Sequence, residues 1–130
     1  MSSISIPTII AEHQIRIASD ISSCGPAFIA FILQQWAKSA AELTNISEQN
    51  ALRLGAEMLL GTGKLLTEGG FTPEELQRRV AVPGGITAEG ITVLRSSLQD
   101  VFSSLIQTTH DKYNEDLNKL SHLFTVDSSN

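Results

Sequence analysis

The sequence predicts an all-α fold, and three observations support this prediction. In the C-terminal third of the chain, apolar residues recur at spacings of three and four, which is typical of helices that bury one face. Helix start signals occur at Ser47 and Thr72, where a hydroxyl residue precedes a run that favours helix. No G-x-G-x-x-G turn opens a strand-helix-strand unit, so a dinucleotide-binding fold is not expected in these 130 residues.

The first segment, residues 3–17, is expected to be extended or irregular. It is rich in β-branched isoleucine and alternates apolar with polar residues in places. A lone strand has nothing to pair with in a helical domain, so the segment is either a linker remnant of a longer protein or a strand that pairs with another subunit. We therefore expect residues 1–17 to be an extension, residues 18–124 one domain and residues 125–130 a tail.

Two long helices are expected next. The first begins near Pro26, because proline costs nothing in a first helical turn, and runs to about Leu43. Its few polar positions predict burial on most sides. The second follows the N-cap Ser47 and ends at Gly69-Gly70.

Three glycines lie inside the second expected helix. Each interior glycine costs up to ~1 kcal/mol relative to alanine. Such residues are tolerated where another helix approaches closely, so Gly55, Gly61 and Gly63 predict a tight helix crossing. The same stretch is not a phosphate-binding loop, because Met58 stands where that motif has glycine and Leu65 where it has serine or threonine.

A capping box predicts the third helix. Thr72 takes the N-cap position, Pro73 the first turn, and Glu75 the position from which a side chain reaches back to the N-cap N–H. This helix is expected to end near Val80.

The last helical region is expected to open at Thr87. It carries an apolar stripe from Ile91 to Phe124, so one of its faces should meet a partner. A break is expected near Ser96-Ser97.

Charge and composition argue against several functional classes. The net charge is −5 and the nine Lys and Arg residues are spread along the chain, so no nucleic-acid partner is expected. No uninterrupted apolar run reaches ~18–20 residues and no signal peptide is visible, so no membrane partner is expected. The single cysteine, Cys24, forms no internal disulfide, which favours a cytoplasmic protein. His13, His110 and His122 lack metal-site spacing, so no metal is expected.

Residues 82–87 (VPGGIT) form the most informative stretch. A Pro-Gly-Gly loop that runs into a helix start exposes backbone N–H groups and a hydroxyl at the positive end of the helix, where an anionic small molecule can bind. On local grounds alone, the alternative of a plain turn between two helices stays open.

Three separate blocks resemble one known family. They are residues 22–28 (SSCGPAF), 59–66 (LLGTGKLL) and 82–87 (VPGGIT). They are similar to the patterns S-G-S-G-P-A-Y, L-G-A-A-K-L-L and S-P-G-G-T-T in the C-terminal domain of pyrroline-5-carboxylate reductases. The likeness runs from about Ala18 to Leu120, and the first and third blocks look closest to a divergent, reductase-like branch.

The resemblance implies a helical dimerisation domain of the 6-phosphogluconate dehydrogenase C-terminal-like type, built as an intertwined homodimer. In the family, a separate Rossmann domain binds NAD(P)H, and the full-length enzyme reduces the imino acid 1-pyrroline-5-carboxylate to L-proline. The resemblance therefore implies no cofactor in this fragment and NAD(P)H in the full-length protein. We expect the fragment alone to be inactive.

The resemblance also assigns substrate binding to Gly84, Gly85 and Thr87, and it assigns no catalytic residue. Two positions depart from the family pattern, since Val82 replaces a serine and Ile86 a threonine or small residue. These departures favour the alternative, a non-catalytic dimerisation or regulatory module. A generic helical-bundle interaction domain remains a third hypothesis, which a monomeric chain would favour.

Overall fold

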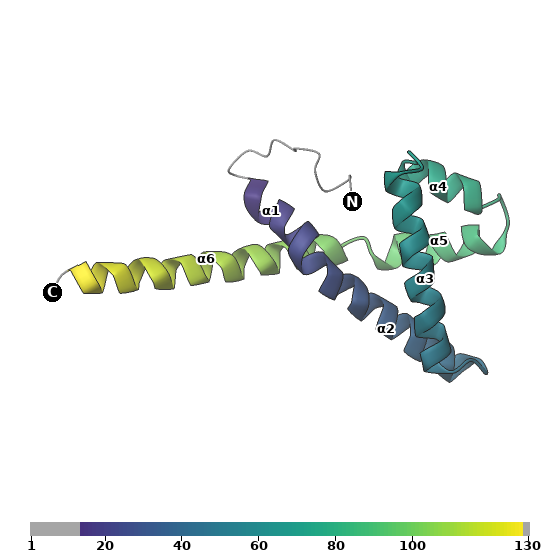
Figure 1. Ribbon diagram of the computed structural model, residues 1–130, viewed down its shortest axis with the longest axis horizontal. Coiled ribbons are helices and arrows are strands. Elements are labelled where there is room, and N and C mark those ends of the chain that lie inside the picture. The colour runs from purple at the N-terminus through teal and green to yellow at the C-terminus, as the bar shows by residue number, and fades with distance from the viewer. Residues whose placement is uncertain (1–13, 129–130) are drawn as a thin grey trace.

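The computed structural model describes residues 14–128, and these residues form helices joined by short loops (Figure 1). No strand occurs among them, which confirms the all-α prediction. In chain order the elements are α1 (Ile15–Ser19), the π-helical turn η3 (Asp20–Cys24), α2 (Gly25–Leu43), α3 (Glu48–Thr67), α4 (Pro73–Val80), α5 (Ile86–Ser97) and α6 (Val101–Ser128).

The helices form an open, elongated arrangement. Figure 1 shows α1, η3 and α2 as one nearly continuous helical run, with α3 returning alongside α2. The short helix α4 lies near the far end of α3, and α5 leads back across the middle of α3 in this view. Helix α6 crosses the beginning of the first run and then projects away from the other helices, so its second half stands alone.

The helical run begins earlier than the sequence predicts. Ile15 and Ile17 are helical in α1, so the expectation of an extended segment up to residue 17 is wrong for these residues, while residues 3–13 lie outside the described part. The physical reason lies in the π-helical turn before Pro26. A wider turn relieves the clash between a proline ring and the preceding carbonyls, so the chain passes from α1 into α2 without leaving the helical region.

Helices α3 and α4 have the predicted boundaries and caps. The Ser47 Oγ accepts a hydrogen bond of 3.1 Å from the Asn50 N–H, and the Thr72 Oγ1 accepts one of 3.1 Å from the Glu75 N–H. The second half of the capping box differs from expectation. The Glu75 carboxylate accepts a 3.1 Å hydrogen bond from the Thr72 hydroxyl rather than from its backbone N–H.

The interior glycines of α3 do not share one role. A Cβ on Gly55 would lie 2.1 Å from Leu33 Cδ1, which confirms a tight crossing of α2 and α3 at that position. A Cβ on Gly61 or Gly63 would meet nothing within 4 Å, so the predicted crossing is wrong for these two glycines within this chain.

The described part of the chain has almost no core of its own. Ala37 is its one buried hydrophobic residue, and Trp36 on α2 is 65% exposed, so the expectation that α2 is buried on most sides is wrong for the isolated chain. The total accessible surface is 10790 Å². A compact monomer of 14.0 kDa is expected to expose about 6,700 Å². The apolar faces of these helices therefore lack partners within the chain.

The exposed apolar surface also bears on whether one of these helices could cross a membrane. The helical run Ile15–Leu43 is long and apolar enough, by length and composition, to cross a membrane, although Gln34-Gln35 interrupts its apolar residues. The core helix of a soluble protein passes the same test, so this property alone does not indicate a membrane protein.

Candidate functional site

A tight turn positions the candidate site at the start of α5. The Gly85 N–H donates a 2.9 Å hydrogen bond to the Val82 carbonyl, with Pro83 and Gly84 between them. Gly84 has φ +74°, a left-handed conformation that side chains disfavour. Proline in the second position and a left-handed glycine in the third are the features of a type II turn.

Gly85 is required for a different reason. Its φ of −87° and ψ of 175° are extended, so any residue can adopt this conformation. A Cβ at this position, however, would lie 2.8 Å from Val82 Cγ2 and 3.1 Å from the Val82 carbonyl oxygen. The backbone can therefore fold closely over Val82 only because Gly85 has no side chain.

Thr87 lies inside the first turn of α5 rather than at its start. The N-cap of α5 is Gly85 and the helix begins at Ile86, so the expectation that Thr87 opens the helix is wrong by one position. A hydroxyl residue is a common start signal for a helix, but the type II turn ends on Gly85 and sets the helix start there. Thr87 lies exposed in the first turn.

The start of α5 retains free hydrogen-bond donors. Gly85 provides no side-chain cap, in contrast to Ser47 at α3 and Thr72 at α4. The first N–H groups of a helix have no partner within the helix, and its dipole favours negative charge there. These donors and the nearby Thr87 hydroxyl are therefore suited to one carboxylate or other small anion.

Apolar residues flank these donors. Val82 is 62% exposed and Ile86 is 93% exposed. The structure thus brings the predicted residues Gly84, Gly85 and Thr87 together in one turn, but the turn lies open on the surface of the chain. A ligand bound there would be shielded from water only if protein surface from outside the described residues covered it.

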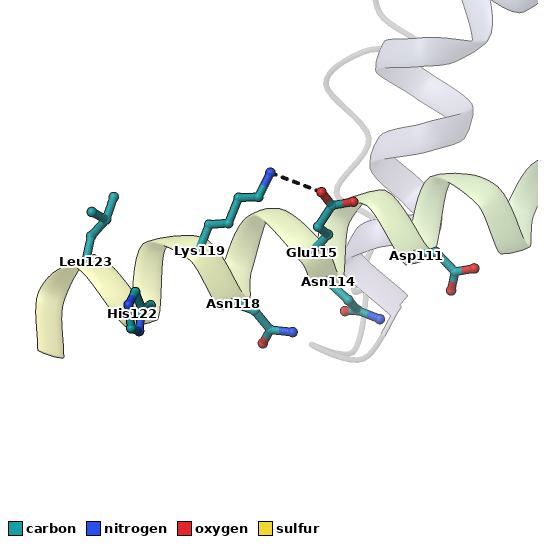
Figure 2. Close-up of a pocket in the computed structure, with 7 residues that line it drawn as sticks. All are labelled: Asp111, Asn114, Glu115, Asn118, Lys119, His122 and Leu123. Carbon is teal, nitrogen blue, oxygen red and sulfur yellow. Dashed lines mark ion pairs between the residues drawn. The ribbon is translucent and has the colours of Figure 1, made fainter. Parts of the chain in front are cut away.

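The second half of α6 forms a hollow surface of a different kind (Figure 2). All seven residues that line this hollow of about 720 Å³ come from α6, so it is one helix face rather than an enclosed site. Glu115 pairs with Lys119 at 3.0 Å, and Lys112 pairs with Asp116 at 3.0 Å. The hydrogen bond from Lys119 lowers the pKa of Glu115, and the hydrogen bond to Asp116 raises the pKa of Lys112. These are solvated i, i+4 pairs on the surface of one helix.

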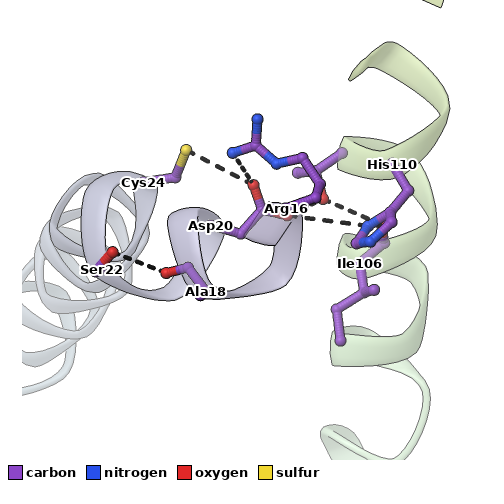
Figure 3. Close-up of polar contacts among 8 residues, drawn as sticks. Arg16, Ala18, Asp20, Ser22, Cys24, Ile106 and His110 are labelled. Carbon is purple, nitrogen blue, oxygen red and sulfur yellow. Dashed lines mark hydrogen bonds and ion pairs between the residues drawn. The ribbon is translucent and has the colours of Figure 1, made fainter. Parts of the chain in front are cut away.

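A polar cluster around Asp20 is absent from the sequence-based predictions (Figure 3). Asp20 is 5% exposed, and its Oδ2 accepts a 2.7 Å hydrogen bond from the Thr109 hydroxyl of α6. The Arg16 Nη2 lies 2.5 Å from Oδ1, and the His110 Nδ1 lies 4.0 Å from Oδ2. Cys24 Sγ lies 4.0 Å from Oδ1. The sequence signal that could have indicated this cluster is Asp20 itself, a charged residue within a helical run that is mostly apolar.

The environment of Asp20 stabilises its charged form. The Thr109 hydrogen bond is the largest cause that lowers the pKa of Asp20, while burial opposes this effect. The hydrogen bond and charge of Arg16 lower the pKa further, and the His110 charge contributes least. Among residues 14–128, no group of three or more His, Cys, Asp or Glu side chains is arranged to hold a metal ion.

Comparisons with known proteins agree with the geometry. The protein-family model described as pyrroline-5-carboxylate reductase dimerisation matches residues 12–116. The chain is 44% identical to ComE operon protein 4 of Bacillus subtilis (strain 168) over 126 residues. The aligned residues cover 97% of this chain and 46% of that protein.

Two further relatives are named as reductases. Pyrroline-5-carboxylate reductase 3 of Bacillus subtilis (strain 168) is 39% identical over 104 residues, or 80% of this chain and 38% of that protein. Pyrroline-5-carboxylate reductase 2 of Bos taurus is 30% identical over 127 residues, or 93% of this chain and 39% of that protein. The chain thus spans less than half the length of each of these relatives. It belongs to the pyrroline-5-carboxylate reductase dimerisation family.

Proposed function

We propose that this chain is the dimerisation and substrate-side domain of a pyrroline-5-carboxylate reductase-like oxidoreductase of the cytoplasm. The full-length protein would reduce 1-pyrroline-5-carboxylate to L-proline with NAD(P)H. The observation that supports this most is the uncapped start of α5 behind a type II turn, in a chain that matches the family over residues 12–116. The proposal keeps one domain over residues 18–124, an extension over 1–17 and a tail over 125–130. The family match covers most of this domain, but it begins at residue 12, inside the proposed extension.

The partner in the proposed assembly is a second copy of this chain. The family description names dimerisation. The accessible surface exceeds that of a compact monomer of this mass by about 4,000 Å². This excess is far larger than the ~800 Å² that each partner buries in a standard interface, and it fits an obligate dimer with interlocked helices.

The proposed ligand group at the start of α5 is the carboxylate of the imino acid. Gly84 and Gly85 shape the turn, while the first N–H groups of α5 and the Thr87 hydroxyl donate hydrogen bonds. The contribution of this site is orientation of the substrate, which lowers the entropic part of the barrier. Neither nucleic acid nor a membrane has a role in this proposal.

The nicotinamide cofactor does not fit the described helices. They contain no strand, and hence no strand-helix-strand unit for a dinucleotide among residues 14–128. In a reductase built from this chain, another domain has to bind NAD(P)H. That cofactor supplies the hydride, and this chain supplies the dimer and the substrate carboxylate site.

A pair of threonine variants on α5 tests the proposed site. The chain is joined to a family Rossmann domain, and proline formation is measured for the parent, Thr87→Val and Thr92→Val. Thr92 is the matched control, because its hydroxyl donates only to the Ala88 carbonyl of its own helix at 3.2 Å. We expect Thr87→Val to raise KM about tenfold, since a hydrogen bond to a charged group is lost, and Thr92→Val to leave it nearly unchanged.

The same assay decides between the proposal and the alternative of a non-catalytic module. Absence of proline formation at every substrate level would reject the catalytic proposal and leave the module. A large gain in turnover for Val82→Ser combined with Ile86→Thr would show that the apolar flanks of the turn have weakened an existing site. Equal effects of Thr87→Val and Thr92→Val would reject the assignment of Thr87.

A further inference from the structure

Asp20 joins two parts of the chain that lie far apart in the sequence. Thr109 on α6, 89 residues away, donates a 2.7 Å hydrogen bond to one oxygen of its carboxylate. The other oxygen pairs with Arg16, one helical turn earlier. A single nearly buried carboxylate therefore connects the α1 and η3 segment to the first third of α6 (Figure 3).

Arg16 adds a second connection across the same junction. Its guanidinium lies 5.0 Å from the centre of the Tyr113 ring on α6, within the range of a cation–π contact. Its Nε is buried without a hydrogen-bond partner, and the contacts of its guanidinium are those with Asp20 and Tyr113. Asp20 thus orients a cation that also contacts α6.

Apolar packing alone does not hold α6 at this angle. Its apolar residues near the junction are substantially exposed, with Phe102 at 46% and Ile106 at 42%. Beyond the junction the helix projects away from the other elements. The specific contacts that join α6 to the first helical run here are therefore those of Asp20 and Arg16.

The junction also forms one end of an apolar groove. The groove has a volume of about 770 Å³ and lies between the η3 and α2 segment on one side and α6 on the other, with Asp20 and Thr109 among its lining residues. Its other lining residues are mainly large and apolar, and they include Ile21, Phe28, Ile32, Phe102, Leu105 and Ile106.

We propose that Asp20 is a positioning residue that holds α6 across η3, and thereby shapes this groove as the docking surface for a helix of the second copy. The inference rests on the homodimer proposed above. The lining requires an apolar helix face as occupant, and this chain supplies such a face on the second half of α6, where Leu117 (44% exposed), Leu120 (52%) and Leu123 (59%) recur every three residues. The dimerisation family and the excess surface both favour a second copy over an unrelated partner.

The first test compares dimer dissociation constants at pH 7 for the 130-residue chain by light scattering across a dilution series. Asp20→Asn and Thr109→Val each break the junction, and we expect each to weaken the dimer about tenfold. Asp116→Asn is the control for charge, because Asp116 forms an exposed pair on α6, and Thr92→Val is the control for a lost threonine hydroxyl. Both controls should change the constant by less than about twofold.

A second readout separates positioning from general stability. The titration of the Asp20 carboxyl is followed by carbon NMR in the parent chain, Thr109→Val and Thr109→Ser. The Thr109 hydrogen bond is the largest cause of the lowered pKa of Asp20, so Thr109→Val should raise the titration midpoint and Thr109→Ser should restore it. Arg16, His110 and the Cys24 thiol face the same carboxyl and are retained in all three proteins.

The sign of the pH effect follows from the lowered pKa of Asp20. Because the folded protein favours the charged carboxylate, Asp20 stabilises the junction at pH values above its ordinary pKa of 3.8. This stabilisation is lost as the pH falls through the lowered pKa of Asp20 in the folded protein. Dimer affinity should therefore fall in that acidic window, and the fall should be smaller in Asp20→Asn.

Each outcome has a distinct meaning. A parent chain that is monomeric at every concentration would overturn both the homodimer and the docking groove. A stable parent dimer with unchanged dissociation constants for Asp20→Asn and Thr109→Val would overturn only the role of Asp20. An unchanged titration midpoint in Thr109→Val would likewise overturn the Asp20 to Thr109 connection.

Discussion

Gly84 and Gly85 are neighbours in the chain, but each meets a different physical requirement. Gly84 has φ +74° and open space around it, so the backbone conformation excludes other residues. Gly85 has an ordinary φ, and the Val82 side chain and carbonyl exclude a Cβ there. Together they place the free N–H groups of α5 directly behind the turn, which is what the proposed carboxylate site needs.

We expect Gly84→Ala to destabilise the protein by about 1–2 kcal/mol, because a left-handed backbone is strained for a residue with a Cβ. Gly90→Ala is the matched control on α5, since a Cβ there meets nothing within 4 Å and φ is not positive. It should stabilise the protein by up to ~1 kcal/mol through helix propensity. Urea unfolding at one fixed chain concentration measures both values, and equal values would contradict the role of the left-handed turn.

At the scale of the helices, local capping signals predicted boundaries well. The hydroxyls of Ser47 and Thr72 cap the helices that they were expected to start, and the predicted break near Ser96-Ser97 falls where α5 ends. These signals depend on residues within four positions of one another. The glycines of α3 were less informative, because the approach of another helix depends on elements far away in the sequence.

The crossing of α2 and α3 provides an element-scale prediction. Gly55→Ala should destabilise the protein by about 1–3 kcal/mol, because Leu33 occupies the space that the new methyl group needs. Gly61→Ala, on the same helix but with open space around it, should stabilise it by up to ~1 kcal/mol. Unfolding in urea is the measurement. A gain in stability at Gly55 would argue against the close crossing, and a loss at Gly61 would indicate that a second copy packs there.

The whole molecule is dominated by apolar surface without partners. Ala37 is the one buried hydrophobic residue among those described, while α2, α3 and α6 each expose large apolar side chains such as Trp36, Leu60 and Phe102. A chain with this arrangement gains its hydrophobic stabilisation mainly from association. Folding and dimerisation should therefore be one coupled process.

Coupled folding and dimerisation make stability depend on concentration. Each tenfold dilution of the chain should cost about 1.4 kcal/mol of apparent stability and lower Tm by a few degrees. Circular dichroism melts over a thousandfold concentration range, with light scattering of the same samples, measure this effect. A Tm that does not change with concentration, in a folded monomer, would favour the generic helical-bundle hypothesis instead.

The sequence by itself determined the all-α class, the limits of α3 and α4, the turn with Gly84 and the membership of the family, because these features depend on short-range patterns. Only the tertiary structure revealed the earlier start of the first helical run, the cap at Gly85 and the buried junction at Asp20. The physical reason differs between them. Asp20 meets a hydroxyl 89 residues away, which no local pattern contains. The helix start and the cap at Gly85 depend on the exact backbone path of a π-helical turn and of a type II turn, which residue preferences alone do not fix.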